Sequence, residues 1–335
     1  MKNTTPILTD PFGRDHTYLR ISLVERCNLR CSYCMPEEGV LLSPKSHLMT
    51  YEEIHTIAKI FVANGVTKIR LTGGEPLIRK DIPIILEKLS SLPIELSITT
   101  NAVIVDKFID TLKNNGVKSI NVSLDSLDKE KFRQITRRDE FEKVYDNIHL
   151  LVDEGFKVKV NAVLIKGFND NEIIDFINFT KDLPVSFRFI EFMPFDGNKW
   201  NMEKMVSYKD VMQYVNTSFP EEQIERLQDA PNDTSKNYKI KGYKGSFAII
   251  SSVSNPFCDT CNRLRLTADG QLKNCLFSSS ESDLLTALRE GRSIEPIIKK
   301  AVQAKLKVRG GMDTIEKLRE PKLHSHNRSM ITIGG

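Results

Sequence analysis

Short runs of β-branched and apolar residues alternate with longer amphipathic segments through about the first 200 residues of the chain. Apolar runs this short are typical of buried strands. We expect six strands, at residues 18–24, 67–71, 94–99, 119–124, 157–165 and 185–192.

The segments between these runs carry apolar residues at the spacing of one helix face. The clearest follows Thr50, which with Glu53 forms the pattern of a capping box. Ile54, Ile57 and Phe61 then lie on one side of the helix. The same periodicity predicts helices near residues 80–91, 103–115, 140–155, 170–182 and 207–217.

Strands that alternate with helices form a parallel sheet, because each helix returns the chain to the same end of the sheet. A complete (β/α)8 barrel takes about 250 residues, whereas this pattern stops near residue 217 after six units. We therefore predict an α/β fold built on an incomplete, TIM-like (β/α)6 barrel. An open doubly wound sheet is the alternative.

From about residue 220 the chain is more polar, with a strand-like run at 246–250 and a helical segment from about 282 to 305. We place a domain boundary here. It separates a partial barrel at 1–220 from a C-terminal α+β extension at 221–335.

The composition is that of a globular protein, with 40% hydrophobic and 27% charged residues. The net charge of +4 is too small to indicate a nucleic-acid partner. No apolar run approaches the ~20 residues of a membrane helix, and the first six residues lack the apolar stretch of a secretory signal. We expect a soluble, cytoplasmic protein.

Six cysteines stand in two tight groups, a spacing that indicates metal or redox chemistry in an intracellular chain. Three thiolates suit a [4Fe–4S] cluster with one iron left open, whereas a structural zinc ion takes four ligands. Zinc and unligated thiols are the alternatives for the first group. His16 or His47 could complete a zinc site, but neither has a conventional spacing to the three cysteines. The first group is Cys27, Cys31 and Cys34, and the second is Cys258, Cys261 and Cys275.

The second group is open to two interpretations from spacing alone, a zinc ribbon that lacks a ligand or a second cluster with an open iron. Arg263 and Arg265 follow it at alternating positions, so in a strand both face one side. Paired arginines suit a phosphate or a carboxylate. A solvated basic strand is the alternative.

Small and polar residues follow several predicted strands, at the rim where barrel active sites are built. Each group alone is typical of a turn, but together they indicate one site. They are residues 72–76, 99–101, 123–125 and 191–194.

Cations stand within four predicted strands, where they either line the barrel lumen or form structural ion pairs beneath a helix. Several in the lumen would attract a highly anionic substrate such as a nucleoside triphosphate. They are Arg20, Arg70, Lys159 and Arg188.

The C-x3-C-x2-C loop after the first strand, with Gly73-Gly74-Glu75-Pro76 after the second, resembles the radical S-adenosylmethionine (SAM) superfamily. Within it, the chain is similar to the GTP 3′,8-cyclase family of molybdenum cofactor biosynthesis. The similar stretches are residues 10–14, 19–22, 26–36, 70–77, 120–125, 188–193 and 257–266, with the terminal Gly334-Gly335.

This resemblance implies a role for each matching residue. Cys27, Cys31 and Cys34 would hold a [4Fe–4S] cluster whose open iron binds SAM. Gly74, Ser123, Met193 and the backbone at Tyr33 would contact SAM. Cys258, Cys261 and Cys275 would hold a second [4Fe–4S] cluster, whose open iron meets guanine. Arg20, Arg70, Thr99, Lys159, Arg263 and Arg265 would contact GTP.

The implied reaction is that of a SAM- and reductant-dependent lyase. A 5′-deoxyadenosyl radical takes hydrogen from ribose C3′, and the carbon radical attacks guanine C8 to give (8S)-3′,8-cyclo-7,8-dihydroguanosine 5′-triphosphate. No catalytic side chain is implied, because the cofactor carries the radical. The implied partners are GTP, a low-potential electron donor and the cyclic pyranopterin monophosphate synthase that acts next, with the chain as a monomer or homodimer.

The chain departs from the family pattern at two places. Val24-Glu25 replaces the more frequent Thr-Asp. Ala102 replaces a glycine, so we expect a slightly different backbone in the loop of Ala102. Composition predicts a flexible Gly334-Gly335 tail, whereas the family's tail reaches into its active site. A peptide-modifying radical SAM enzyme and a zinc-dependent binding module are the competing functions.

Overall fold

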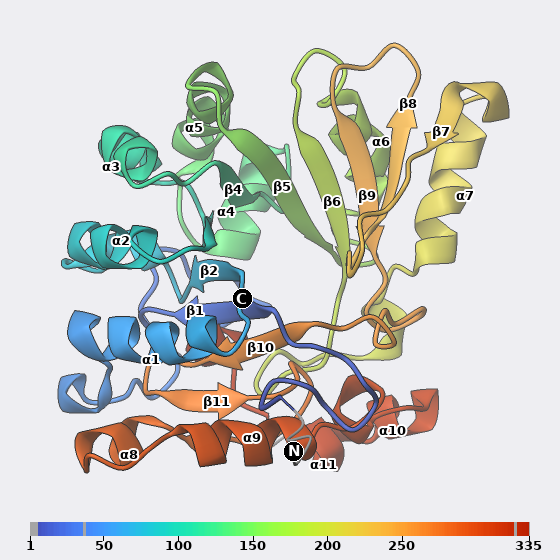
Figure 1. The fold of residues 1–335 in the computed structure, drawn as a ribbon. Coiled ribbons are helices and arrows are strands. Elements are labelled where there is room, and N and C mark those ends of the chain that lie inside the picture. Colours follow the sequence, from blue (N-terminus) through green and yellow to red (C-terminus); the bar gives the residue numbers. More distant parts are fainter. Residues whose placement is uncertain (1–5, 36–37, 325–326, 335) are drawn as a thin grey trace.

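The structure is a computed structural model that describes residues 6–35, 38–324 and 327–334 (Figure 1). One mixed sheet of 12 strands runs through it in the order β12-β11-β10-β1-β2-β3-β4-β5-β6-β9-β8-β7. All six strands expected in the first part are confirmed: β1 (Tyr18–Ser22), β2 (Lys68–Thr72), β3 (Glu95–Thr100), β4 (Ser119–Ser123), β5 (Lys157–Leu164) and β6 (Ser186–Glu191).

The C-terminal part extends this sheet at both ends. Strand β10 pairs in parallel with β1, and β9 pairs in parallel with β6, so eight neighbouring strands are parallel. The outer strands then pair antiparallel, and the strand order does not close into a ring. The incomplete barrel with a C-terminal extension is therefore confirmed. The added strands are β7 (Ile224–Arg226), β8 (Lys236–Ile240), β9 (Ser246–Ile250), β10 (Arg263–Leu266), β11 (Gln271–Lys273) and β12 (Ser282–Asp283).

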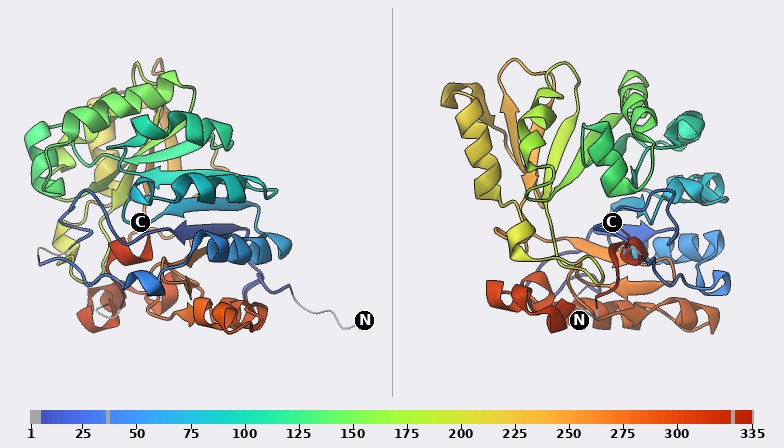
Figure 2. Two further views of the ribbon diagram at one scale, coloured as in Figure 1. Left: turned by 90° about the vertical axis from the view of Figure 1, so that its left-hand side faces the viewer. Right: turned by 180° about the vertical axis from the view of Figure 1, so that it is seen from behind.

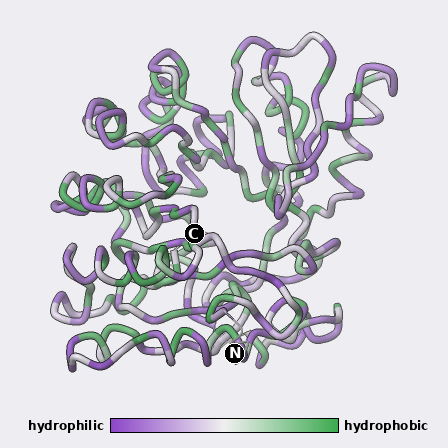
Figure 3. Tube along the Cα trace, in the orientation of Figure 1, coloured by the Kyte–Doolittle hydropathy of each residue, from purple (hydrophilic) through white to green (hydrophobic). Residues whose placement is uncertain are grey.

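Helices cover the outer side of the parallel strands, which form an open arc (Figures 1 and 2). Along these helices hydrophobic and hydrophilic positions alternate (Figure 3), and their apolar faces join the main core. They are α1 (Tyr51–Ala63), α2 (Ile82–Ser90), α3 (Ile109–Asn114), α4 (Lys129–Thr136), α5 (Phe141–Asp153), α6 (Ile173–Asn178) and α7 (Tyr208–Ser218). The capping box of Thr50 and Glu53 begins α1 as expected.

Two helical expectations need correction. Helix α4 was missed, because it is mostly polar and buries only Phe132, Ile135 and Thr136. The single helix expected from about 282 to 305 is wrong. The chain forms α8 (Leu285–Arg289) and α9 (Glu295–Gln303), separated by a turn in which Gly291 has a φ of 70°.

Short helices complete the extension: α10 (Ile315–Arg319), α11 (Pro321–His324) and α12 (Met330–Ile333). The sheet runs across the proposed boundary at residue 220, which stays a prediction. Among the described residues, no helix has the length and apolarity needed to cross a membrane.

Candidate functional site

Both cysteine groups line one cavity of about 510 Å³ inside the arc of parallel strands. Loops that follow the strands form one side of the cavity, and the extension forms the other. All the residues to which the family resemblance gives a role in cluster, SAM or GTP binding lie on its lining, although the roles themselves stay predictions. These residues are Arg20, Cys27, Cys31, Tyr33, Cys34, Arg70, Gly74, Thr99, Ser123, Lys159, Met193, Cys258, Cys261, Arg263, Arg265 and Cys275.

The loop of the first cysteine group is held by backbone hydrogen bonds. The amides of Cys34 and Met35 donate to the carbonyl of Cys31, which closes a tight turn. The amides of Arg30 and Ser32 donate to carbonyls at the end of α4, at 2.9 Å each. The helix that sequence reasoning missed is therefore a support for this loop.

The three cysteines of the first group are partly buried and lie close enough for their charges to interact. Burial and the charge of Glu75 raise the pKa of Cys27 to about 11, and burial and the charge of Cys27 raise that of Cys34 to about 12. Burial and the charge of Asp125 also raise the pKa of Cys31. Three thiolates here need a positive partner, which the irons of a cluster provide.

Two glycines bring the second strand's loop against the first cysteine group. The amide of Gly74 donates to the carbonyl of Val24 at 2.7 Å, and that of Glu75 donates to the carbonyl of Arg26 at 2.8 Å. A Cβ on Gly74 would lie 2.1 Å from the Arg26 carbonyl oxygen. The glycine is thus required for a close approach between two loops of the chain itself.

The Glu75 carboxylate is hydrogen-bonded by residues of its own loop and of the loop after β3. Its carboxylate accepts hydrogen bonds from the amides of Leu77 at 3.0 Å and Asn101 at 2.7 Å and from the hydroxyl of Thr100 at 2.8 Å. The amide side chain of Asn101 in turn donates to the Cys27 thiol at 3.6 Å. Burial raises the pKa of Glu75 to about 7. Glu75 therefore orders the rim next to the first cysteine group.

Tyr33 is fixed from the opposite side. Its hydroxyl donates to the Asp125 carboxylate at 2.8 Å, and the amide of Val163 donates to the other oxygen of that carboxylate at 2.8 Å. Burial raises the pKa of Asp125 to about 6. The ends of β4 and β5 thereby hold the loop that carries Cys31 and Cys34.

Cations cross the sheet in register and face the cavity. Positions two apart in each strand share a face, and the strand pairing aligns them between neighbours. Two rows result. In one, Tyr18 lies between the cations Arg263 and Lys68, and the other consists of Arg265, Arg20 and Arg70.

These cations repel one another. Burial and the charges of Arg188 and Arg70 lower the pKa of Lys159 to about 8, and burial lowers those of Arg20 and Arg188 to about 10. Arg20, Arg70, Lys159 and Arg188 all line the cavity, so the alternative position beneath a helix is wrong for these four side chains. The cavity is suited to a polyanion.

Several buried polar atoms on the lining find no hydrogen-bond partner within the described residues. A buried polar group without a partner costs free energy, so such atoms indicate a polar ligand. They are Tyr18 Oη, Thr99 Oγ1, Asn121 Oδ1, Asn161 Oδ1 and Arg188 Nε. Asn121 and Asn161 were missed, although each alternates with buried apolar residues in its strand.

The second cysteine group is surrounded by cations. Burial acts to raise the pKa of Cys261, but the charges of Lys305 and Arg263 outweigh it and the pKa is lowered. The Cys258 thiol accepts a hydrogen bond from the amide of Arg309 at 3.4 Å. Sequence reasoning missed Lys305 and Arg309, because nothing in the local pattern marks them.

Neither group is arranged around an ion in this structure. In the part of the chain described, no set of three or more His, Cys, Asp or Glu side chains meets the geometry of a metal-ion site. In an iron–sulfur cluster each thiolate binds a different iron. Three sulfur donors on one cavity lining fit such a cluster in each group.

The C-terminal segment is packed rather than flexible as far as Gly334, which corrects the expectation for that residue; Gly335 lies outside the described residues. Ser329 donates to the carbonyl of Cys34 at 2.7 Å, and Arg265 donates to the carbonyl of Gly334. A Cβ on Gly334 would lie 2.4 Å from Thr72 Oγ1. The role of the tail in the chemistry stays a prediction.

The two departures from the family pattern are accommodated. Ala102 keeps a φ of 60° and is held by Thr100 and Asn147, so the substitution does not move this loop out of the left-handed region. Glu25 accepts hydrogen bonds from the amide and hydroxyl of Ser43, at 2.6 and 2.9 Å. It thereby ties down the segment that follows the first cysteine group.

A buried histidine beside β1 gives the fold a pH dependence. His16 contacts Asp10 at 3.1 Å, and burial and the charge of Lys305 lower its pKa from 6.5 to about 4. The folded chain keeps His16 neutral, so its contribution is complete above pH 6.5 and is lost as the pH falls toward about 4. We expect a loss of about 3 kcal/mol in the free energy of unfolding across this window.

Urea unfolding from pH 7.5 to 4.5 measures this loss. The variant His16→Gln keeps a donor for Asp10 and removes the titration, so it should show a shallower slope than the parent. Equal slopes in the two proteins would contradict the assignment to His16.

Comparisons with known proteins identify the family of the chain. The family model of the radical SAM superfamily matches residues 21–180, and the model Molybdenum Cofactor Synthesis C matches residues 185–310. GTP 3′,8-cyclase, mitochondrial, of Arabidopsis thaliana is 50% identical over an alignment of 335 positions that covers 98% of this chain and 84% of that protein. GTP 3′,8-cyclase of Listeria welshimeri serovar 6b is 43% identical over 305 residues, covering 89% of this chain and 91% of that protein.

Other relatives are longer. Molybdenum cofactor biosynthesis protein 1 of Drosophila melanogaster is 48% identical over 325 residues, 95% of this chain but 56% of that protein. The chain spans about half the length of the relatives with this name. Streptococcus suis SuiB bound to S-adenosylmethionine superposes with a TM-score of 0.59 at 18% identity, over 81% of this chain and 65% of SuiB. At that identity the likeness shows the fold alone.

Proposed function

Because the chain belongs to the GTP 3′,8-cyclase family of the radical SAM superfamily, we propose that it converts GTP to (8S)-3′,8-cyclo-7,8-dihydroguanosine 5′-triphosphate. This is the first step of molybdenum cofactor biosynthesis. One observation carries the proposal: two cysteine groups and two rows of cations line a single cavity.

In this proposal the two cysteine groups have different tasks. Cys27, Cys31 and Cys34 hold a [4Fe–4S] cluster beside the SAM site, which is formed by Tyr33, Gly74, Ser123 and Met193. When bound, the cluster and SAM supply the 5′-deoxyadenosyl radical that removes hydrogen from ribose C3′. Cys258, Cys261 and Cys275 hold a second [4Fe–4S] cluster next to the guanine.

The chain's own residues bind and orient the substrate. The cations of the cavity neutralise the triphosphate, and they are Arg20, Arg70, Lys159, Arg263 and Arg265. Arg188 adds a further positive charge. The unpartnered oxygens of Thr99 and Asn121 are placed to hydrogen-bond the nucleoside. A ribose fixed next to the SAM site would lower the barrier by positioning.

Proposed partners follow from the same chemistry. A low-potential electron donor supplies the electron for SAM cleavage, and the cyclic pyranopterin monophosphate synthase takes the product. We propose a cytoplasmic location from the chain's composition, whereas the Arabidopsis relative is named mitochondrial.

Anaerobic incubation of the iron-reconstituted chain with SAM, dithionite and each nucleoside triphosphate in turn tests the function. We expect 5′-deoxyadenosine and a cyclised nucleotide with GTP alone, and about eight iron atoms per chain. 5′-Deoxyadenosine without a cyclised product from GTP would contradict the cyclase, and a peptide substrate would then be sought. About four iron atoms per chain would contradict the second cluster.

Removing two arginines of the cation rows is expected to weaken GTP binding. In the double variant Arg263→Met/Arg265→Met the dissociation constant should rise by about 10- to 100-fold, since a hydrogen bond to a charged group is worth about 1.5–3 kcal/mol. The difference from the parent should shrink as salt rises, because salt screens the attraction that the parent retains. Calorimetry without reductant measures it, with the exposed Arg292→Met as control. Unchanged affinity would contradict a triphosphate site here.

A further inference from the structure

The segment at residues 8–16 forms a hook before β1, which we call the N-terminal hook. Thr9 and Asp15 pair as an antiparallel bridge across it. The Asp10 carboxylate accepts hydrogen bonds from the amides of Phe12 at 2.9 Å and Arg14 at 3.1 Å. These bonds close the turn, so the orientation of the Arg14 side chain is set by local structure.

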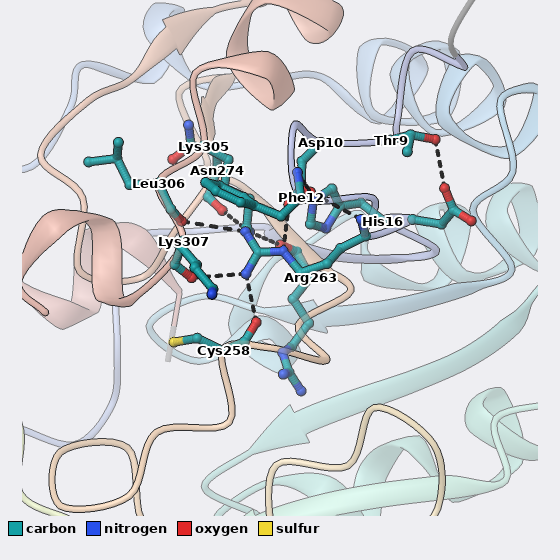
Figure 4. A network of polar contacts seen from close by, with 12 residues as sticks. Thr9, Asp10, Phe12, His16, Cys258, Arg263, Asn274, Lys305, Leu306 and Lys307 are labelled. Atoms are coloured by element: carbon teal, nitrogen blue, oxygen red, sulfur yellow. Dashed lines mark hydrogen bonds and ion pairs between the residues drawn. The ribbon is translucent and has the colours of Figure 1, made fainter.

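The Arg14 guanidinium is buried and uses its whole planar fork. Its Nε donates to the Asp10 carboxylate at 2.7 Å. One terminal nitrogen donates to the carbonyls of Cys258 at 2.6 Å and Lys307 at 2.9 Å, and the other donates to Leu306 at 3.4 Å. Figure 4 shows the polar network that includes Asp10, Cys258, Leu306 and Lys307. A lysine ammonium cannot reproduce this fork.

Both the carbonyl and the thiol of Cys258 are therefore held against the segment at residues 307–309. Arg14 holds its carbonyl next to that of Lys307, and the amide of Arg309 donates to its thiol at 3.4 Å. The other end of the cysteine group is held in a similar way. Lys305 donates to the carbonyls of Arg263, at 3.1 Å, and of Asn274, the residue before Cys275.

We propose that Arg14 is a positioning residue for the second cysteine group, fixing the Cys258 backbone so that its thiol is presented to the iron–sulfur cluster. The inference rests on the second cluster of the proposed function. Arg14 is not on the cavity lining, whereas Cys258 is. Its effect on the site therefore acts through the backbone carbonyls that it holds, that of Cys258 among them, and not through direct contact with SAM or substrate.

The two cysteine groups can be studied separately. A chain with Cys27, Cys31 and Cys34 changed to Ala reports on the second group, and a chain with Cys258, Cys261 and Cys275 changed to Ala reports on the first. Arg14→Lys is placed in both chains. Arg292→Lys serves as the matched control, since Arg292 is an exposed arginine of the C-terminal extension that carries the second cysteine group.

The first readout is the rate at which a chelator removes iron, followed by visible absorbance. We expect Arg14→Lys to speed iron loss from the second group about 10- to 100-fold, the effect usual for a residue that orients a metal ligand. The electron paramagnetic resonance of the reduced second cluster should change as well. The first group and the control should be unaffected. An equal effect on both groups, or none on the second, would overturn the proposal.

The second readout needs no iron. In the metal-free six-cysteine chain, Arg14→Lys should speed alkylation of Cys258 relative to Cys27, Cys31 and Cys34. If the chain that keeps only Cys258, Cys261 and Cys275 takes up no iron, the proposal of a second cluster is wrong. The alkylation rate of Cys258 then decides by itself whether Arg14 positions this residue. Unchanged reactivity of Cys258 overturns that role.

Chemical rescue guards against a variant that merely unfolds. Millimolar guanidinium should restore slow iron release or slow alkylation in Arg14→Ala, whereas methylammonium should not. Failure of guanidinium to restore either would count against Arg14.

Discussion

The variant Cys275→Ala is expected to lose cyclised nucleotide by more than about 100-fold while it still cleaves SAM to 5′-deoxyadenosine. Loss of a residue that only orients a metal ligand already costs about 10- to 100-fold, and this change removes a ligand itself. SAM cleavage is spared because the two cysteine groups pack in different places. Cys27 and Cys31 pack against the main core, whereas Cys275 packs against a separate cluster that includes Phe277 and Met312.

Chromatography of 5′-deoxyadenosine and of the nucleotide product measures both activities in one reaction. Iron per chain should fall to about half in Cys275→Ala. The matched variant Cys31→Ala should lose both activities. If Cys275→Ala lost SAM cleavage to the same degree with its fold intact, the two groups would not have separate tasks.

Gly74→Ala is expected to disrupt the first cysteine group. The added Cβ would lie 2.1 Å from the carbonyl oxygen of Arg26 and 2.5 Å from its carbon. Both are backbone atoms of the residue before Cys27, so the cysteine loop must move. We expect a destabilisation of about 1–3 kcal/mol, as for other overpacked sites, together with about a 100-fold loss of SAM cleavage, as for displaced reacting groups.

The glycine control separates backbone strain from this close approach. Gly116 has a φ of 66° and open space where a Cβ would lie, so Gly116→Ala should cost about 1–2 kcal/mol of strain and leave SAM cleavage unchanged. Urea unfolding and 5′-deoxyadenosine formation are measured for both variants. Normal SAM cleavage in Gly74→Ala would show that the loops can separate without harm.

Local patterns in the sequence predicted the parts of the site that depend on one strand and its loop. The alternation of Arg263 and Arg265 placed both on one face, and the structure shows them in β10 on the cavity lining. Their alignment with Tyr18 and Arg20 could not be predicted, because it depends on pairing between distant strands.

Features held by distant backbone groups were also beyond local patterns. Arg14 stands in a polar turn and binds three carbonyls from far along the chain. Helix α4 has too few apolar positions to show a clear period, yet its end supports the first cysteine group. Gly334 was expected to be flexible from composition, whereas its contacts with Thr72 and Arg265 come from the assembled barrel.

The position of β1 between β2 and β10 has a consequence for synthesis on the ribosome. Domains generally fold as units while the chain emerges N-terminal end first. Strands β1 to β6 are available early, but one edge of β1 has no neighbour until residues 263–266 appear. An open strand edge can pair with another chain. The nascent barrel therefore carries an open, aggregation-prone edge until residues 263–266 have emerged and cover it.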